Sequence, residues 1–197
     1  MKNILIRKSP ESVTVDGKSY AINTDHRTCL TAIIAFEDPE LTPMEKYTVM
    51  IRLLFQDIPE NVEEAMKAAV QFLDGPMNRS SSDAPVAKRV YSFAKDANLI
   101  FAAFRQTHGI DLSQETLHWW TFLALFMDLG ADTAFCNLVS LRTRVKNGKA
   151  TKAEKQQAKE MGDLFKIEDY DTRTLEQKEA ERRFMELENS RQKNARS

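Results

Sequence analysis

The sequence has 197 residues and a net charge of -1; 42% of the residues are hydrophobic, 29% are charged, and glycine and proline number 6 each. This balance supplies enough apolar side chains for one globular core, but it excludes a collagen-like or Gly-rich chain and disfavours a loop-dense all-β fold. The near-neutral charge gives no global attraction to nucleic acid, and no apolar run approaches the roughly 18 residues of a membrane-spanning helix. We therefore expect a soluble, intracellular and mainly helical protein.

The first elements in chain order form a predicted β-hairpin, which we assign to residues 1–24. Apolar and polar side chains alternate on both sides of the dipeptide Asp16-Gly17. Asp-Gly readily adopts the positive φ angles of a tight two-residue turn, so the two alternating runs are expected to pair. Because an isolated hairpin is marginally stable in water, we expect it to dock on the helices or to gain a strand from a partner.

Three helices with clear end signals are expected between the hairpin and residue 77. Each start carries a side chain that can cap a helix, and the second start also has proline in the first turn. Glutamate follows three residues after the second and third caps, as in a capping box. The expected starts are Asp25, Thr42-Pro43 and Asn61, and the expected ends lie near Phe36, before Ile58-Pro59 and at Asp74-Gly75-Pro76.

Three further helices complete a predicted core that spans residues 25–147. A long helix is expected from Asp83 to Gly109, after a loop at residues 77–84 that is the best candidate for a hinge. The next helix is expected from Ser113 to Gly130, and apolar residues on almost all of its faces favour a central, buried position. The last is expected from Asp132 to Asn147-Gly148.

Residues 148–197 form a predicted charged helical extension. The chain from residue 142 onward holds 15 Lys and Arg and 11 Asp and Glu residues but few large apolar ones. Thr151 with Glu154 predicts one capped helix, and another is expected from about residue 174 to residue 189. Leu175, Phe184 and Leu187 are the few apolar anchors of that second helix. Residues beyond Ser190 are expected to be disordered. The expected fold is therefore mainly α, with about eight helices and one N-terminal hairpin.

No motif predicts catalysis, a cofactor or a metal. His108, Asp111 and His118 are close in sequence, yet Asp111 suits a backbone-capping role and His118 adjoins two tryptophans of the predicted buried helix. Cys29 and Cys136 lack the spacing of a disulfide or zinc framework, and both are expected to be packed thiols rather than nucleophiles. Paired carboxylates such as Glu37-Asp38 lie at predicted helix ends, where helix dipoles and solubility explain them.

Two features leave a structural and a functional interpretation open. One is a local basic run, which is a solvated helix end by default and a phosphate-binding surface as the less favoured alternative. Its members are Arg142, Arg144, Lys146, Lys149, Lys152 and Lys155. The other is Trp119-Trp120. Adjacent helix positions point about 100° apart, so we favour a core role for Trp120 and leave Trp119 between the core and an exposed partner contact.

A specific residue pattern runs from Asp96 to Arg142. Its members are Asp96, Leu99-Ile100-Phe101-Ala102-Ala103-Phe104, Gly109-Ile110-Asp111-Leu112, Leu117-His118-Trp119-Trp120, Phe122, Leu129, Thr133, Phe135 and Leu141-Arg142. In order and spacing this pattern resembles the bacteriophage Gp15 family, and the early helices and charged C-terminal region fit the family's general layout. The stretch from Ile110 through Trp120 is the most specific part. The resemblance therefore extends over most of the chain.

The resemblance implies a non-enzymatic role in tail morphogenesis. The family occurs in tailed phages and prophages of Gram-positive bacteria, and its genes typically lie between those of the major tail protein and the tape measure protein. That position is associated with tail assembly chaperones, which coat the helical tape measure protein before the tail tube polymerises. The implied partners are the tape measure protein, further tail proteins and a second copy of the chain, in the host cytoplasm. The family offers no catalytic residues to carry over.

Client binding is expected at grooves beside the long helix and along the charged extension. Apolar anchors and flanking charges of the extension suit weak, multivalent contacts with a helical partner. The candidate contact residues are Trp119, Leu175, Arg182, Arg183, Phe184, Glu186 and Leu187. The alternatives are a structural tail component retained in the virion and, less favoured, a nucleic-acid-binding regulator. An enzyme ranks last because no constellation joins a nucleophile, a base and a stabilising group.

Overall fold

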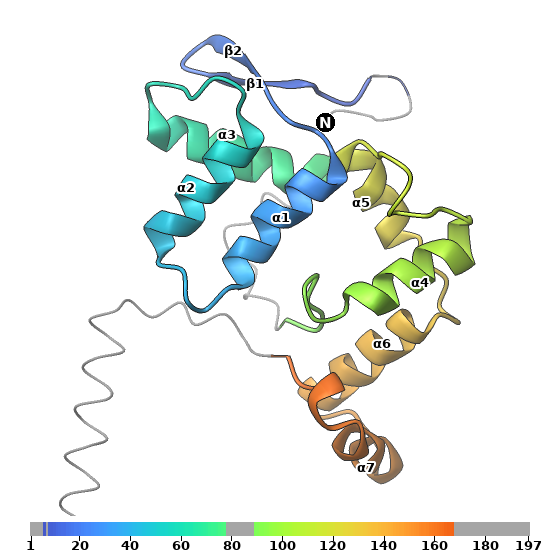
Figure 1. The fold of residues 1–197 in the computed structure, drawn as a ribbon. Helices are drawn as coiled ribbons and strands as arrows, with labels where there is room; N and C mark the ends of the chain where they lie inside the picture. Colours follow the sequence, from blue (N-terminus) through green and yellow to red (C-terminus); the bar gives the residue numbers. More distant parts are fainter. Residues whose placement is uncertain (1–5, 7, 78–88, 168–197) are drawn as a thin grey trace, which may run out of the picture.

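A computed structural model describes residue 6 and residues 8–77 and 89–167. A two-stranded hairpin precedes seven α-helices in this part of the chain, so the predicted mainly helical fold is confirmed (Figure 1). The further helix expected from residue 174 lies outside the described residues. The elements are β1 (Ser12–Val15), β2 (Lys18–Ala21), α1 (His26–Glu37), α2 (Pro43–Leu54), α3 (Val62–Leu73), α4 (Ala97–His108), α5 (Trp119–Met127), α6 (Ala134–Lys146) and α7 (Lys152–Glu160), with short 3-10 turns at Gly75–Met77 and Gly162–Leu164.

The hairpin has the predicted turn and docks on the helices. β1 and β2 are antiparallel, and Val15 is paired with Lys18 across the turn. Asp16 and Gly17 have φ angles of 48° and 75°, as a tight turn with two left-handed residues requires. β1 contacts α3, and the buried Val15 belongs to the main core. In Figure 1 the hairpin lies across the end of the molecule formed by α2 and α3. This packing stabilises strands that would be marginal alone.

Helices α1, α2 and α3 begin at the predicted caps. Asp25 accepts a hydrogen bond from the backbone N–H of Arg27 at 2.7 Å. Thr42 forms a complete capping box with Glu45 at the start of α2. The Asn61 side chain accepts from the Glu64 backbone N–H at 3.2 Å. These side chains satisfy backbone donors that have no partner within the helix, which is why local sequence was sufficient to place these starts.

The prediction of one long helix from Asp83 to Gly109 is wrong for the first part of that range. The described chain is not helical from Arg89 to Asp96, and α4 begins only at Ala97. Side chains accept from the backbone N–H groups of residues 92–95, and only at Asp96 is the donor bound by a carbonyl one turn earlier, that of Ser92 at 2.9 Å. Asp96 accepts from the Ser92 N–H at 3.0 Å, and Glu37 on α1 accepts from the Phe93 N–H at 3.1 Å. A nearby carboxylate, Asp96, and a distant one, Glu37, therefore bind backbone donors where the apolar spacing predicted a helix.

The start of α5 also differs from the prediction, because the helix begins at Trp119 rather than near Ser113. The chain around Leu117 pairs with the chain at the start of α1: His26 N–H donates to the Leu117 carbonyl at 3.0 Å, and Trp119 N–H donates to the Thr24 carbonyl at 2.7 Å. His118 then caps α5. A smaller shift occurs at α6, where Thr133 and not Asp132 is the cap. The start of α5 therefore depends on hydrogen bonds to a segment far away in sequence.

Phe122 on α5 lies at the centre of the core, as the apolar character of this helix predicts. Its ring stacks on those of Phe104 and Trp119, with centroids 5.0 Å and 5.3 Å apart. The His26 ring also stacks on the Phe122 ring, with the two centroids 5.6 Å apart. Trp119 is fully buried and Trp120 is 6% exposed. Both tryptophans are therefore core residues, so the exposed partner contact left open for Trp119 is wrong: α5 is packed on several sides.

The first part of the charged extension is packed on the core. α7 contacts α6, and Arg144 on α6 forms an ion pair with Glu154 on α7 at 2.8 Å. Thr151 and Glu154 form the predicted capping box. Ala158 is buried against the rest of the molecule. The chain from residue 148 to residue 167 is thus a packed continuation of the helical core.

Candidate functional site

The three histidines have structural hydrogen bonds. His26 Nδ1 accepts from the Leu117 N–H at 3.2 Å, and burial lowers the pKa of its imidazole. His118 Nδ1 accepts from the Trp120 N–H at 3.0 Å, which is its capping bond. His108 Nε2 lies 2.9 Å from the Leu125 carbonyl. Among residues 8–77 and 89–167, no cluster of three His, Cys, Asp or Glu side chains forms a metal site.

The two cysteines are free thiols in packed positions. Cys29 is buried, and this burial raises its pKa to about 12. Because the thiolate is the reactive form of cysteine, Cys29 has the inert environment that the sequence predicts. Cys136 is half-buried, with its Sγ 3.5 Å from the Leu129 carbonyl oxygen.

The basic run is partly internal, so the interpretation as a solvated helix end is wrong for Arg142, whereas Lys149, Lys152 and Lys155 are exposed. Arg142 is 1% exposed. Arg144 is paired with Glu154, and Lys146 Nζ donates to the Arg89 carbonyl at 2.6 Å. These three cations are used to join α6 to other segments. The run therefore offers fewer outward charges for phosphate than its sequence suggests.

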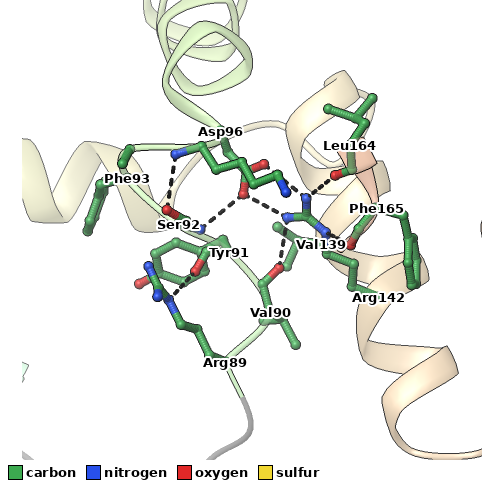
Figure 2. A network of polar contacts seen from close by, with 12 residues as sticks. Arg89, Val90, Tyr91, Ser92, Phe93, Asp96, Val139, Arg142, Leu164 and Phe165 are labelled. Atoms are coloured by element: carbon green, nitrogen blue, oxygen red, sulfur yellow. Dashed lines mark hydrogen bonds and ion pairs between the residues drawn. The ribbon is translucent and has the colours of Figure 1, made fainter. Parts of the chain in front are cut away.

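Arg142 and Asp96 form a buried ion pair that we call the Asp96–Arg142 clasp (Figure 2). Arg142 Nη1 lies 2.7 Å from Asp96 Oδ2, and Nη2 lies 3.0 Å from Oδ1. The guanidinium also donates to the carbonyls of Val90 at 3.1 Å and Phe165 at 2.9 Å, and to that of Leu164. One side chain of α6 thus ties together the residues before α4 and the end of the described chain.

Glu37 holds the same stretch from the other side. Its side chain is 8% exposed and forms an ion pair with Arg89. It accepts hydrogen bonds from the backbone N–H groups of Phe93 and Ala94, at 3.1 Å and 3.3 Å, and from the Ser92 hydroxyl. The predicted explanation through helix dipoles is wrong for Glu37, because a carboxylate at a helix C-terminus is unfavourable there. Its partners in residues 89–94 offset that cost.

These two polar anchors fix residues 89–96, and this stretch presents aromatic side chains to α1. Tyr91 and Phe93 have ring centroids 5.4 Å apart, and Phe93 packs on Phe126 at 5.2 Å. Burial and the nearby Glu37 carboxylate raise the pKa of Tyr91. Phe93 lines cavities on two sides of α1. The buried ion pairs therefore shape apolar surface at a distance from themselves.

The larger cavity is about 490 Å³, and we call it the α1–α3 groove. Tyr47 and Val70 stand at its rim with 37% and 39% exposure. Trp119 supports its base and donates from Nε1 to the Leu73 carbonyl at 2.9 Å. Asp74 is the one charged residue of the lining, and burial raises the pKa of its carboxyl. The full lining is Ile33, Phe36, Tyr47, Met50, Val70, Leu73, Asp74, Tyr91, Phe93, Trp119 and Leu123.

A second cavity of about 300 Å³ lies between α1 and α4, and we call it the α1–α4 groove. Its lining is almost wholly apolar, and Ile34 at its edge is 37% exposed. The lining residues are Leu30, Ile34, Phe93, Ala97, Asn98, Ile100, Phe101, Leu112 and Phe122. α1 thus has an apolar hollow on each side. The run Ile33-Ile34-Ala35-Phe36 carries a signal for this arrangement, because adjacent apolar residues on a helix face different sides.

Of the seven predicted contact residues, the structure describes one. Trp119 is buried beneath the α1–α3 groove, as described above. The other six lie outside the described residues, and their role stays a prediction: Leu175, Arg182, Arg183, Phe184, Glu186 and Leu187. Sequence patterns missed the rim residues Ile34, Tyr47 and Val70, because each lies on a helix that also has a strong core-facing stripe. Their partial exposure depends on where neighbouring helices stop.

Membrane insertion through a helix has no support in the described part of the chain. Every helix there is too short or too polar to cross a bilayer.

Comparison with known proteins gives one informative result. No curated protein and no solved structure matches the chain significantly. A family model, Bacteriophage Gp15 protein, matches residues 5–167. This match includes the hairpin, all seven described α-helices, both grooves and the Asp96–Arg142 clasp. It confirms the resemblance found between Asp96 and Arg142 and extends it toward both ends. The chain belongs to the bacteriophage Gp15 protein family.

Proposed function

We propose that the protein is a non-enzymatic tail assembly chaperone that binds the phage tape measure protein before the tail tube polymerises. Membership of the Gp15 family supports a role in phage structure or morphogenesis. An unassembled tape measure protein exposes long amphipathic helices, and a chaperone must cover their apolar faces reversibly. We place this binding in the host cytoplasm, with several copies of the chaperone on each client chain.

The α1–α3 groove is the observation that carries this proposal. It is a preformed hollow of about 490 Å³ with an aliphatic and aromatic lining. An amphipathic helix binds such a groove by inserting apolar side chains spaced three or four residues apart. Tyr47 and Val70 at the rim already expose apolar surface, so a client helix would cover area that water now contacts.

Asp74 adds a preference for one kind of client sequence. It is the one charged side chain in the lining; the residue is exposed at the C-terminal end of α3, and desolvation by the apolar lining raises the pKa of its carboxyl. A Lys or Arg of the client, next to the inserted apolar residues, would stabilise the charged form of Asp74. We therefore propose that the bound helix carries a basic residue beside its apolar anchors.

Co-expression with the tape measure protein of the same phage tests the proposal. We expect a soluble complex with many chaperone copies for each client chain, measured by size-exclusion chromatography with light scattering. Val70→Lys should weaken the complex about tenfold or more, because it places a charge at the groove. Val62→Lys is the matched control, since Val62 lies on the same helix, is 49% exposed and does not line the groove.

Two results would contradict the proposal. The first is an insoluble client beside a well-folded free chaperone. The second is equal binding by the Val70→Lys and Val62→Lys variants, which would exclude the α1–α3 groove as the client site. Mass spectrometry of purified phage particles addresses the alternative function. Stoichiometric amounts of the protein in particles would favour a structural tail component over a chaperone that leaves before completion.

A further inference from the structure

The described chain ends beside the α1–α4 groove. Ile167, its last residue, lines a cavity of about 410 Å³ together with Ile34 and Lys95. Ile34 also lines the α1–α4 groove, and Ala97 of that groove follows two residues after Lys95. The two hollows are therefore adjacent along α1 and the start of α4. The described chain therefore ends at a cavity that adjoins the apolar α1–α4 groove.

The Asp96–Arg142 clasp fixes this exit point. Arg142 donates from Nε to the Phe165 carbonyl at 2.9 Å, and its guanidinium is held by the buried Asp96 carboxylate. Figure 2 shows Leu164 and Phe165 reaching the same guanidinium as Val90, which lies just before α4. Two residues after Phe165, Ile167 reaches the cavity that it lines together with Ile34 of α1 and Lys95 before α4.

The sequence after Ile167 contains a segment that suits the groove. In the helix predicted from about residue 174 to residue 189, Phe184 and Leu187 are three positions apart and share one face. Arg182 and Glu186 lie two positions from Phe184 on either side, which places them on the opposite face. A cavity of about 300 Å³ has room for these two apolar side chains.

We propose that residues 175–187 fold back onto their own chain and seat Phe184 and Leu187 in the α1–α4 groove. The reach is sufficient, because the seven residues from Ile167 to Thr174 span up to ~23 Å when extended. A tethered segment binds at an effective concentration in the millimolar range, so a weak apolar contact is enough to keep it docked.

Docking in this groove leaves the α1–α3 groove open and turns Arg182 and Glu186 outward. The extension would then present charges, rather than apolar anchors, to a bound client. This consequence rests on the proposed function, whereas the docking itself concerns the free protein and does not depend on the identity of any client.

Paramagnetic relaxation in the full-length protein tests the docking. A nitroxide is attached at Ser190→Cys in a Cys136→Ser background, while the buried Cys29 is left in place. We expect strong broadening of the amide signals of Leu30, Ile34 and Asn98, and unchanged signals around Val62. Dilution should not alter the broadening, because the contact is intramolecular.

Matched variants show whether the apolar anchors cause the contact. Leu187→Asp should abolish the broadening. Leu175→Asp should retain it, because Leu175 lies nine positions before Phe184, half a turn away from that face. The Ile34→Lys variant should lose the contact from the side of the groove, whereas Ile58→Lys, another exposed apolar position, should not.

Three results would overturn the proposal. One is the absence of broadening at the α1–α4 groove while the rest of the spectrum stays folded. Another is equal broadening in the Leu187→Asp and Leu175→Asp proteins. The third is broadening that arises only when isotope-labelled chains are mixed with spin-labelled ones, because the occupant would then belong to a second copy. None of these results depends on tape measure binding, which the co-expression experiment measures separately.

Discussion

The N-terminal region from β1 to α3 and the junction around α6 are stabilised in different ways. In the first, local caps start each helix, and apolar side chains such as Leu54 and Phe72 are buried between the elements. At the junction, a fully buried arginine and aspartate hold three segments that are far apart in sequence. The first arrangement follows from neighbouring residues, whereas the second requires the tertiary fold.

This difference predicts how each region responds to substitution. Losing one local cap removes a hydrogen bond that water can partly replace, because helix ends are accessible. Removing one member of a buried ion pair leaves an uncompensated charge in a medium of low polarity, and that cost is larger. The junction is therefore expected to be the more fragile region, although it contains fewer elements.

The largest expected effect comes from Arg142→Met. This change leaves the Asp96 carboxylate, which is 0% exposed, without its cation and should lower the free energy of unfolding by about 3–5 kcal/mol. Urea unfolding followed by circular dichroism measures the change. Arg144→Met is the control, because the Arg144 and Glu154 side chains are 42% and 25% exposed, so that water screens the pair and it should contribute at most about 1 kcal/mol. Equal losses of unfolding free energy in the two variants would contradict the expectation that the junction is the more fragile region.

The next effect concerns Gly75, which ends α3 at the edge of the α1–α3 groove. Its φ angle is +74°, and an added Cβ would lie 2.6 Å from Leu123 Cδ1. Gly75→Ala should therefore cost more than the about 1–2 kcal/mol of a left-handed L-residue, because Leu123 must also move. Gly148→Ala is the control: its φ is +71° but nothing lies within 4 Å. A smaller loss for Gly75→Ala than for Gly148→Ala in urea unfolding would contradict the packing described here.

A smaller effect is expected at the start of α2. Thr42→Ala removes the capping box with Glu45 and should cost about 1 kcal/mol. Thr48→Ala on the same helix is the control, because the Thr48 hydroxyl only donates to the Met44 carbonyl within the helix and Ala favours helix formation. Thermal unfolding of the two variants distinguishes them. Identical midpoints would show that the local cap does not stabilise this region.

The smallest expected effect is a pH dependence at His26. Burial lowers its pKa below the ordinary value of 6.5, so the unfolded chain binds a proton before the folded one does. The contribution of neutral His26 to stability is thus complete above about pH 6.5 and declines as pH falls through the interval down to the lowered pKa. Unfolding free energies from about pH 7.5 to about pH 5.5 should fall less steeply in His26→Gln. An unchanged slope would exclude His26 as a cause.

The two regions meet at α1, and this meeting creates the candidate site. The N-terminal region supplies Tyr47 and Val70 to the α1–α3 groove, while the junction supplies Tyr91 and Phe93 through the fixed stretch at residues 89–96. A loosened clasp would release those aromatic side chains. If the proposed function holds, Arg142→Met should therefore weaken binding of the tape measure protein as well as folding stability, even though Arg142 lines neither groove.

The sequence by itself determined the elements whose signals are local. Asp16-Gly17 predicted the hairpin turn, and Thr42 and Thr151 predicted capped helices, because a tight turn or an N-cap is completed by residues within a few positions. The all-round apolar character of residues 117–127 was sufficient to predict a central α5. The residue pattern from Asp96 to Arg142 was sufficient to indicate the Gp15 family, which the family match then confirmed.

The tertiary structure alone decided where α4 begins and which side chains form the site. Apolar spacing favours a helix before Asp96, yet Glu37 and Arg142 bind backbone groups of that stretch from elements far away in sequence. Local patterns contain no information on such partners. The grooves beside α1 depend on the same long-range bonds, because they hold Phe93 between the two hollows. The sequence alone likewise did not show whether Arg142 is buried or belongs to a solvated basic run.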